Sequence, residues 1–125
     1  MGRILYLDDD MQLAGLLARR LAQMGHSVQA CSDASEALRV FNSSPEVFDL
    51  VLTDMSMPGG SGLEFAQQVL KRRPDARVVI ASGCEDPNWA GFARSVGVEA
   101  VLLKPFQLQE FADAISRLAD CSASD

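Results

Sequence analysis

Five short apolar segments alternate with five segments of helical periodicity, and this alternation restricts the folds open to the chain. The expected strands cover residues 4–7, 27–31, 50–52, 77–81 and 98–103. After each of them, apolar residues recur three and four positions apart, which is the spacing of one face of an amphipathic helix. Buried strands joined by helical crossovers form a parallel sheet with helices on both faces. The sequence therefore predicts an α/β fold.

Local signals set the expected ends of the helices. Asp33 and Ser61 each stand three residues before a glutamate, which is the capping-box spacing at the start of a helix. Asp86 stands directly before a proline, a favourable pair for the cap and the first residue of a helix. Gly25 and Gly97 follow helical segments and are expected to end them.

The length and composition indicate one globular domain. At 125 residues the chain is long enough to bury a sizeable core. A hydrophobic content of 48% with 22% charged residues is typical of a folded protein rather than a disordered one. We expect the domain to span residues 1–125, with its core at about 3–120 and a polar tail at 121–125.

The charge pattern argues against several kinds of partner. The formal net charge is −6 and no block of Lys and Arg is present, so this domain is not expected to bind nucleic acid or anionic membranes directly. No apolar segment approaches the roughly 18 residues of a membrane span, and no signal peptide is evident. Three cysteines without metal-type spacing, Cys31, Cys84 and Cys121, are expected to be free thiols. These features predict a cytoplasmic protein.

Polar residues stand at the carboxyl ends of four of the expected strands, and they are Asp8 and Asp9, Asp54, Ser82 and Lys104. In a doubly wound sheet these ends converge on one edge, which is where ligands bind. Each residue also has an ordinary structural explanation, such as a helix-start acid, a turn hydroxyl or a solvated surface charge. Their common position at the ends of different strands favours a shared site.

The residue types of this shared site indicate a chemistry. Neighbouring carboxylates repel one another unless a cation lies among them, and an all-oxygen set of ligands suits Mg²⁺ or Mn²⁺. A hard cation beside a carboxylate, a hydroxyl and an ammonium group can hold a phosphoryl group. A carboxylate could then attack phosphorus and form an aspartyl phosphate.

Over essentially its whole length the chain resembles the receiver domain of two-component response regulators and hybrid histidine kinases. The resemblance rests on residues 4–10 (ILYLDDD), on Asp54-x-x-Met57-Pro58-x-x-x-Gly62, on Ser82-Gly83 and on Lys104-Pro105-Phe106. It implies a flavodoxin-like (βα)5 fold, in which a five-stranded parallel sheet of order 2-1-3-4-5 carries helices on both faces. Family receivers often have a cis peptide bond before the proline that corresponds to Pro105.

The same resemblance implies a metal site. Asp9 matches the acid that binds Mg²⁺ directly, and Asp8 matches its partner, which often acts through water. Asp54 and the backbone carbonyl of Ser56 would complete the protein ligands. Mg²⁺ is the expected cofactor, with Mn²⁺ as a possible substitute, and no organic cofactor is expected, because three acids would repel a cofactor phosphate.

The resemblance also implies a reaction. Asp54 matches the phospho-acceptor, while Ser82 and Lys104 match the residues that bind the phosphoryl oxygens. The donor would be a phosphohistidine on a histidine kinase or a histidine phosphotransfer protein. The domain would catalyse only its own phosphorylation and dephosphorylation, so it is not expected to be an enzyme with a small-molecule product. Ser56 and Cys84 match variable positions that tune hydrolysis of the aspartyl phosphate.

One position departs from the family pattern. Receivers often carry Tyr or Phe three residues before the lysine, and that ring turns inward on phosphorylation, but this chain has Val101. The output therefore uses the helix after Asp86 or is weak, and a domain that relays its phosphoryl group onward needs less of a switch. Residues 54–58 and 82–83 are more similar to receivers attached to hybrid kinases. Receivers can form homodimers through their last two helices, but the sequence shows no decisive apolar patch for such a contact.

Three alternatives compete with this interpretation. A phosphatase of the haloacid dehalogenase type would use Asp8-x-Asp10 with Ser82 and Lys104, but the chain lacks the further acidic pair that this family needs beyond its lysine. A flavodoxin-like cofactor binder conflicts with the three acids. A pseudo-receiver would bind partners without phosphorylation.

Other conspicuous residues are expected to have structural roles. Trp89 is interpreted as partly buried packing rather than as a partner anchor. His26 follows a helix-stopping glycine and is expected at the surface without a partner. Residues 71–73 (KRR) form a basic helix end, which is favourable for the helix dipole and gives less support to a docking role.

Overall fold

The computed structural model describes residues 2–57, 60–82, 87–103 and 107–120. The elements in chain order are β1 (Arg3–Leu7), α1 (Met11–Gln23), β2 (Ser27–Cys31), α2 (Ala34–Ser43), β3 (Leu50–Asp54), β4 (Ser56–Met57), β5 (Gly60–Ser61), α3 (Gly62–Arg72), β6 (Val78–Ser82), α4 (Pro87–Ser95), β7 (Ala100–Leu103) and α5 (Leu108–Asp120). The predicted alternation of strands and helices is confirmed.

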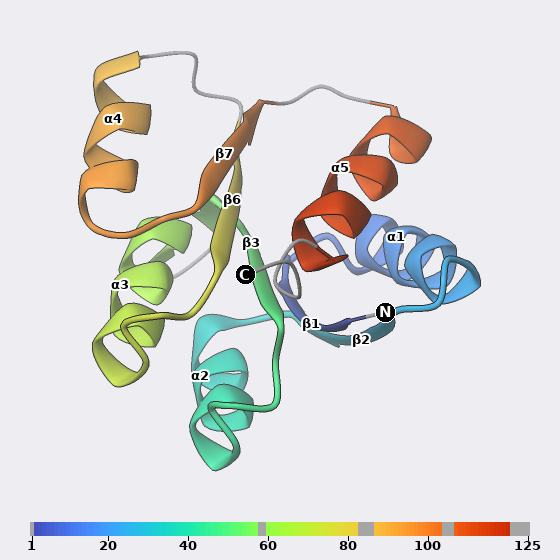
Figure 1. Ribbon diagram of the computed structural model, residues 1–125, viewed down its shortest axis with the longest axis horizontal. Coiled ribbons are helices and arrows are strands. Elements are labelled where there is room, and N and C mark those ends of the chain that lie inside the picture. The colour runs from blue at the N-terminus through green and yellow to red at the C-terminus, as the bar shows by residue number, and fades with distance from the viewer. Residues whose placement is uncertain (1, 58–59, 83–86, 104–106, 121–125) are drawn as a thin grey trace.

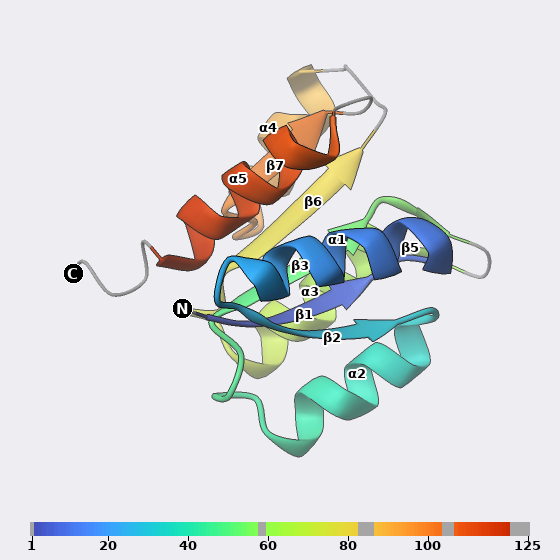
Figure 2. The ribbon, with the colours of Figure 1, turned by 90° about the vertical axis from the view of Figure 1, so that its right-hand side faces the viewer.

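Five strands form one parallel sheet of order β2-β1-β3-β6-β7 (Figure 1). Counted within that sheet alone, the order is 2-1-3-4-5, and the flavodoxin-like fold class is confirmed. Figure 2 shows β1, β2 and β6 running in the same direction, away from the N-terminus. Strands β4 and β5 form a separate antiparallel pair that pairs Ser56 with Ser61. The sequence indicated only a turn in this segment.

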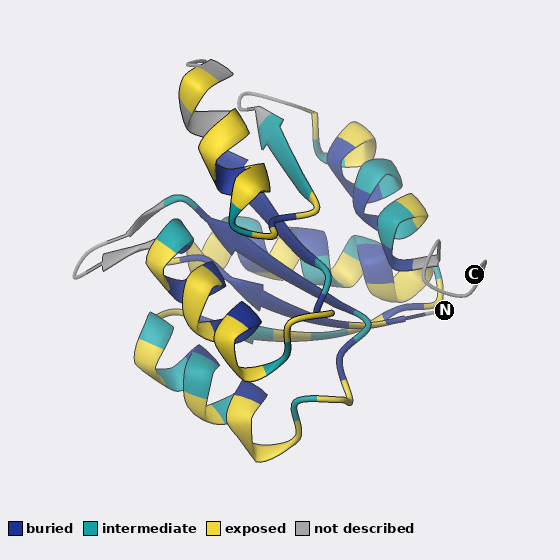
Figure 3. Cartoon of the chain, turned by 60° about the vertical axis from the view of Figure 1, so that its left-hand side comes forward, coloured by how far each residue is buried: buried dark blue, intermediate teal, exposed yellow. Residues whose placement is uncertain are grey.

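Helices cover both faces of the sheet because every central strand alternates its side chains between two cores. Ile4 and Tyr6 of β1 pack under α1 and α5, whereas Leu5 and Leu7 pack under α2, α3 and α4. Figure 1 shows these two helix layers on opposite sides of the sheet. Strands β3 and β6 are buried along their whole length, as Figure 3 shows by colour.

Two glycines end helices as predicted. Gly25 and Gly97 have positive φ angles of 95° and 110°, which favour glycine over other residues. Each is followed by a residue whose N–H bonds five positions back, from His26 to Leu21 and from Val98 to Ala93. Both are Schellman motifs. The second motif explains why the strand expected at residues 98–103 begins only at Ala100.

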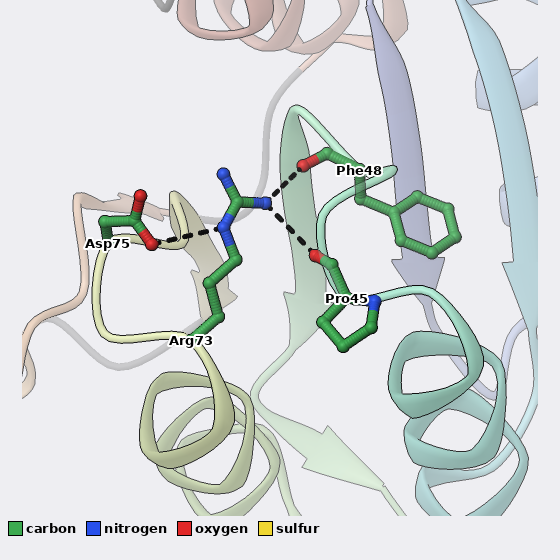
Figure 4. A network of polar contacts seen from close by, with 4 residues as sticks. All are labelled: Pro45, Phe48, Arg73 and Asp75. Atoms are coloured by element: carbon green, nitrogen blue, oxygen red, sulfur yellow. Dashed lines mark hydrogen bonds and ion pairs between the residues drawn. The ribbon is translucent and has the colours of Figure 1, made fainter.

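Arg73 joins two connections on the helix-α3 side of the sheet (Figure 4). Its guanidinium Nη1 donates to the carbonyls of Pro45, at 3.1 Å, and Phe48, at 2.9 Å, and its Nε contacts Asp75 at 3.2 Å. One side chain therefore satisfies two carbonyls in the loop before β3. This third residue of the basic helix end has a structural role. Lys71 and Arg72 lie in the last turn of α3, and the preference for a helix-dipole role over a docking role stays a prediction for them.

His26 is not a surface residue, and the sequence-based prediction was wrong. Its side chain is 4% exposed; Nδ1 accepts from the N–H of Gly2 at 2.9 Å, and Nε2 lies 2.8 Å from Oγ of Ser116. Because Nδ1 accepts, Nε2 carries the proton of the neutral ring and donates to Ser116. The turn at Gly25 sends the imidazole inward, where it joins the start of β1 to α5.

The other sequence predictions fall partly outside the described residues. Cys31 is a buried free cysteine, and burial raises the pKa of its thiol to about 11. Cys84 and Cys121 lie outside the described residues, as does the peptide bond before Pro105, and the side chain of Trp89 is not described. Across the described ranges, no helix is both long and apolar enough to cross a bilayer.

The contacts of His26 predict a measurable contribution to stability. Replacing His26 with Ala removes one buried and one partly buried hydrogen bond and leaves a cavity, so the free energy of unfolding should fall by about 2–3 kcal/mol. Ser116→Ala removes one of the bonds and should cost about 1 kcal/mol. Urea denaturation in Mg²⁺-free buffer measures both. A His26→Ala variant as stable as the wild type would contradict this role.

Candidate functional site

The predicted site residues gather at the carboxyl edge of the sheet. Asp54 is the last residue of β3 and Ser82 the last of β6, and β3 and β6 are neighbours in register. Asp8 and Asp9 follow β1, which lies on the other side of β3. Lys104 follows Leu103, the β7 partner of Ser82, but Lys104 itself lies outside the described residues.

The three acids form one compact cluster. Asp8, Asp9 and Asp54 each offer a carboxylate oxygen, and these oxygens lie within 4.8 Å of one another. Asp8 is 2% exposed and Asp54 7% exposed, whereas Asp9 is open to solvent. Holding carboxylates together at this depth is unfavourable without a cation. The all-oxygen set, open on one side, fits Mg²⁺ or Mn²⁺, which keep several waters.

Both oxygens of Asp8 accept hydrogen bonds from the protein. Oδ2 accepts from the hydroxyl of Tyr6 at 2.7 Å, and Oδ1 accepts from the backbone N–H of Asp10 at 2.9 Å. The side chain of Asp10 turns away and caps α1 by accepting from the N–H of Leu13. Burial and the neighbouring Asp8 raise the pKa of Tyr6 far above its usual value, so its hydroxyl remains a neutral donor.

The backbone around Asp54 is fixed by close contacts. The carbonyl of Asp54 accepts from the hydroxyl of Thr53 at 2.9 Å, and Met55 joins β6 through the carbonyl of Ala81. The N–H of Gly62 donates to the carbonyl of Met55 at 2.7 Å. A Cβ on Gly62 would lie 2.2 Å from the carbonyl oxygen of Asp54, so no side chain fits there. The glycine of the sequence motif is therefore required by space.

Ser82 and Ser56 are placed only in part. Ser82 is buried at the end of β6, beside the strand that carries Asp54. Ser56 lies in β4, two residues beyond Asp54, and its role as a carbonyl ligand remains a prediction. Val101, at the position where an aromatic was expected from the family, is a half-buried residue of β7 that packs against the core under α2, α3 and α4.

Sequence reasoning missed the residues that support the acids. Tyr6 stands two positions before Asp8, so the two-residue period of a strand places both on one face, and this signal was available. No comparable sequence pattern predicts the hydrogen bonds that the Thr53 hydroxyl and the Asp10 N–H donate. Both bonds depend on the path that the chain takes beyond each strand.

Residues 4–116 match the sequence model of the response regulator receiver domain, and the chain belongs to this family. It is 33% identical over 114 residues to the DNA-binding transcriptional regulator NtrC of Azospirillum brasilense. The aligned region covers 91% of this chain and 23% of that protein. The chain thus spans about a quarter of the length of that regulator.

Solved structures agree with this assignment. A response regulator receiver domain protein from Clostridium thermocellum is 30% identical, with a TM-score of 0.86 and coverage of 97% of this chain and 96% of that one. The response regulator TrrA from Thermotoga maritima, solved in complex with Mg²⁺-BeF, is 28% identical, with a TM-score of 0.79 and coverage of 94% and 99%. The chain therefore carries the receiver domain of two-component response regulators.

The position of Gly62 generates a prediction. Gly62→Ala forces the loop away from the Asp54 carbonyl and should lower the free energy of unfolding by about 2–3 kcal/mol. Gly15→Ala is a matched control, because nothing lies within 4 Å of its added Cβ on α1, and it should stabilise the protein by about 0.5–1 kcal/mol. Urea denaturation measures both, and equal effects of the two substitutions would contradict the packing argument.

Proposed function

We propose that this chain is the phospho-accepting domain of a two-component phosphorelay. Asp54 takes a phosphoryl group from a phosphohistidine on a histidine kinase or a histidine phosphotransfer protein. The observation that carries the proposal is the cluster of Asp8, Asp9 and Asp54 at the carboxyl edge of a receiver fold. The resulting aspartyl phosphate switches or relays the signal.

The reaction follows from the positions of the acids. A carboxylate oxygen of Asp54 attacks phosphorus, a P–O bond forms, and the P–N bond to the histidine breaks, leaving its electron pair on the imidazole. Ser82 donates to a phosphoryl oxygen, and Lys104 neutralises another. Asp8, Asp9, Asp54 and the carbonyl of Ser56 would hold Mg²⁺, which supplies positive charge against the phosphoryl oxygens. Hydrolysis by water regenerates Asp54.

The phosphatase alternative is less consistent with the geometry. It would use the side chains of Asp8 and Asp10 together as its pair of acids. Asp10 is exposed and caps α1, where its Oδ1 accepts from Leu13 at 3.1 Å. Both oxygens of Asp8 accept hydrogen bonds from other groups. These contacts support a role for Asp8 in holding a metal rather than in attacking phosphorus.

The output we propose is a relay or a weak switch, because Val101 lacks the ring of the family switch. The similarity of residues 54–58 and 82–83 to hybrid histidine kinases favours the relay. A cytoplasmic location agrees with the charge and composition. Relatives such as NtrC are named as DNA-binding, but the net charge of −6 supports no direct contact of this domain with nucleic acid. A homodimer is compatible with this function.

The phospho-acceptor can be tested by intact mass after incubation with acetyl phosphate and Mg²⁺. The wild type should gain one phosphoryl group, and Asp54→Asn should gain none, because the amide is not a nucleophile. The exposed Asp75→Asn is a matched control and should be labelled like the wild type. Labelling that persists at full stoichiometry in Asp54→Asn would contradict the assignment of the acceptor.

The metal site can be tested by thermal unfolding. Mg²⁺ binds only the folded cluster, so at about 100 times its dissociation constant it should add about 2.7 kcal/mol to the free energy of unfolding. Asp9→Asn should lose most of this response. NaCl of matched ionic strength controls for general screening. Identical melting temperatures in the two salts would rule out a metal site of useful affinity.

A further inference from the structure

Tyr6 lies beneath the acidic cluster and is 1% exposed. Its ring belongs to the buried cluster under α1 and α5, where the other side chains are all hydrocarbon. These side chains are Ile4, Ala14, Leu17, Leu21, Leu50, Leu52, Val79, Ala81, Phe111, Ala112, Ile115 and Ala119. Phenylalanine would fill the same core space, so packing alone does not account for the hydroxyl.

The Tyr6 hydroxyl donates a hydrogen bond to the carboxylate of Asp8. Asp8 directly follows β1, two residues after Tyr6, and the phenol reaches past the end of the strand to Oδ2 of Asp8 at 2.7 Å. A bond between a phenol and a carboxylate is charge-assisted and stronger than a neutral one. The neutral phenol adds no charge of its own to the cluster.

Two donors together fix the plane of the Asp8 carboxylate. Tyr6 binds Oδ2 from inside the core, and the N–H of Asp10 binds Oδ1 from the chain that leads into α1. In this orientation a carboxylate oxygen of Asp8 lies within 4.8 Å of oxygens of Asp9 and Asp54, where the three could share a cation. Of these two hydrogen bonds, only the one from Asp10 to Oδ1 would remain if the phenol were removed.

We propose that Tyr6 is a positioning residue, whose hydroxyl holds the Asp8 carboxylate in the orientation that the Mg²⁺ site requires. This inference rests on the proposed function, because it assumes that the acidic cluster binds Mg²⁺. Partners that orient a metal ligand change metal affinity by 10- to 100-fold when they are removed. Asp8 keeps its second donor in Tyr6→Phe, so the effect lies near the lower limit.

The test is the dissociation constant of Mg²⁺, measured by calorimetric titration of the full chain. Tyr6→Phe should raise it about tenfold while the far-UV circular dichroism stays that of the wild type. Ser116→Ala is the matched control, because it also removes a hydroxyl that is hydrogen-bonded within the fold, but at the opposite edge of the sheet. Its dissociation constant for Mg²⁺ should equal that of the wild type.

A double-mutant cycle separates positioning from a general structural effect. Tyr6 acts through Asp8, so in the Asp8→Asn background Tyr6→Phe should change the dissociation constant by less than about twofold. A tenfold effect in both backgrounds, or none in the wild-type background, overturns the inference alone. A wild-type chain that binds no Mg²⁺ overturns the metal site of the proposed function together with the inference.

Discussion

The parallel, in-register pairing of β1, β3 and β6 is the constraint on which the rest of the structure depends. It buries the backbone of three strands and requires a helix layer on each face. It also brings the ends of all three strands to one edge, so the residues that follow them become neighbours. The acidic cluster is therefore a direct consequence of the topology, and its chemistry depends only on which side chains occupy those ends.

That placement creates an electrostatic problem, because Asp8 and Asp54 are buried beside each other and beside Asp9. The surrounding fold offsets part of it with fixed donors to Asp8, while tight backbone packing holds Asp54 in place. Tyr6 and the N–H of Asp10 hold Asp8, while Gly62 allows the loop after β3 to lie against the carbonyl of Asp54. The remaining repulsion is what makes the cluster receptive to a cation.

The sequence predicted those parts of the fold that depend on local or periodic signals. The strands follow from short apolar segments, the strand-end acids from their position directly after those segments, and the stops at Gly25 and Gly97 from glycine conformation. His26 was misplaced because its partner Ser116 is 90 residues away, and no local pattern encodes that pairing. The roles of Thr53 and Gly62 depend on how the loop after β3 packs, and Lys104 and Pro105 lie outside the described residues.

The packing of α5 against Tyr6 affects the order in which the domain assembles during synthesis. Phe111 and Ile115 of α5 share the core face that holds the Tyr6 ring. A nascent chain that has emerged only as far as β7 already contains every acid of the cluster, yet α1 alone covers the face of the sheet that α5 will share. The core beneath Asp8 is completed only when α5 leaves the ribosome and docks, so a competent site forms after the rest of this domain has been synthesised.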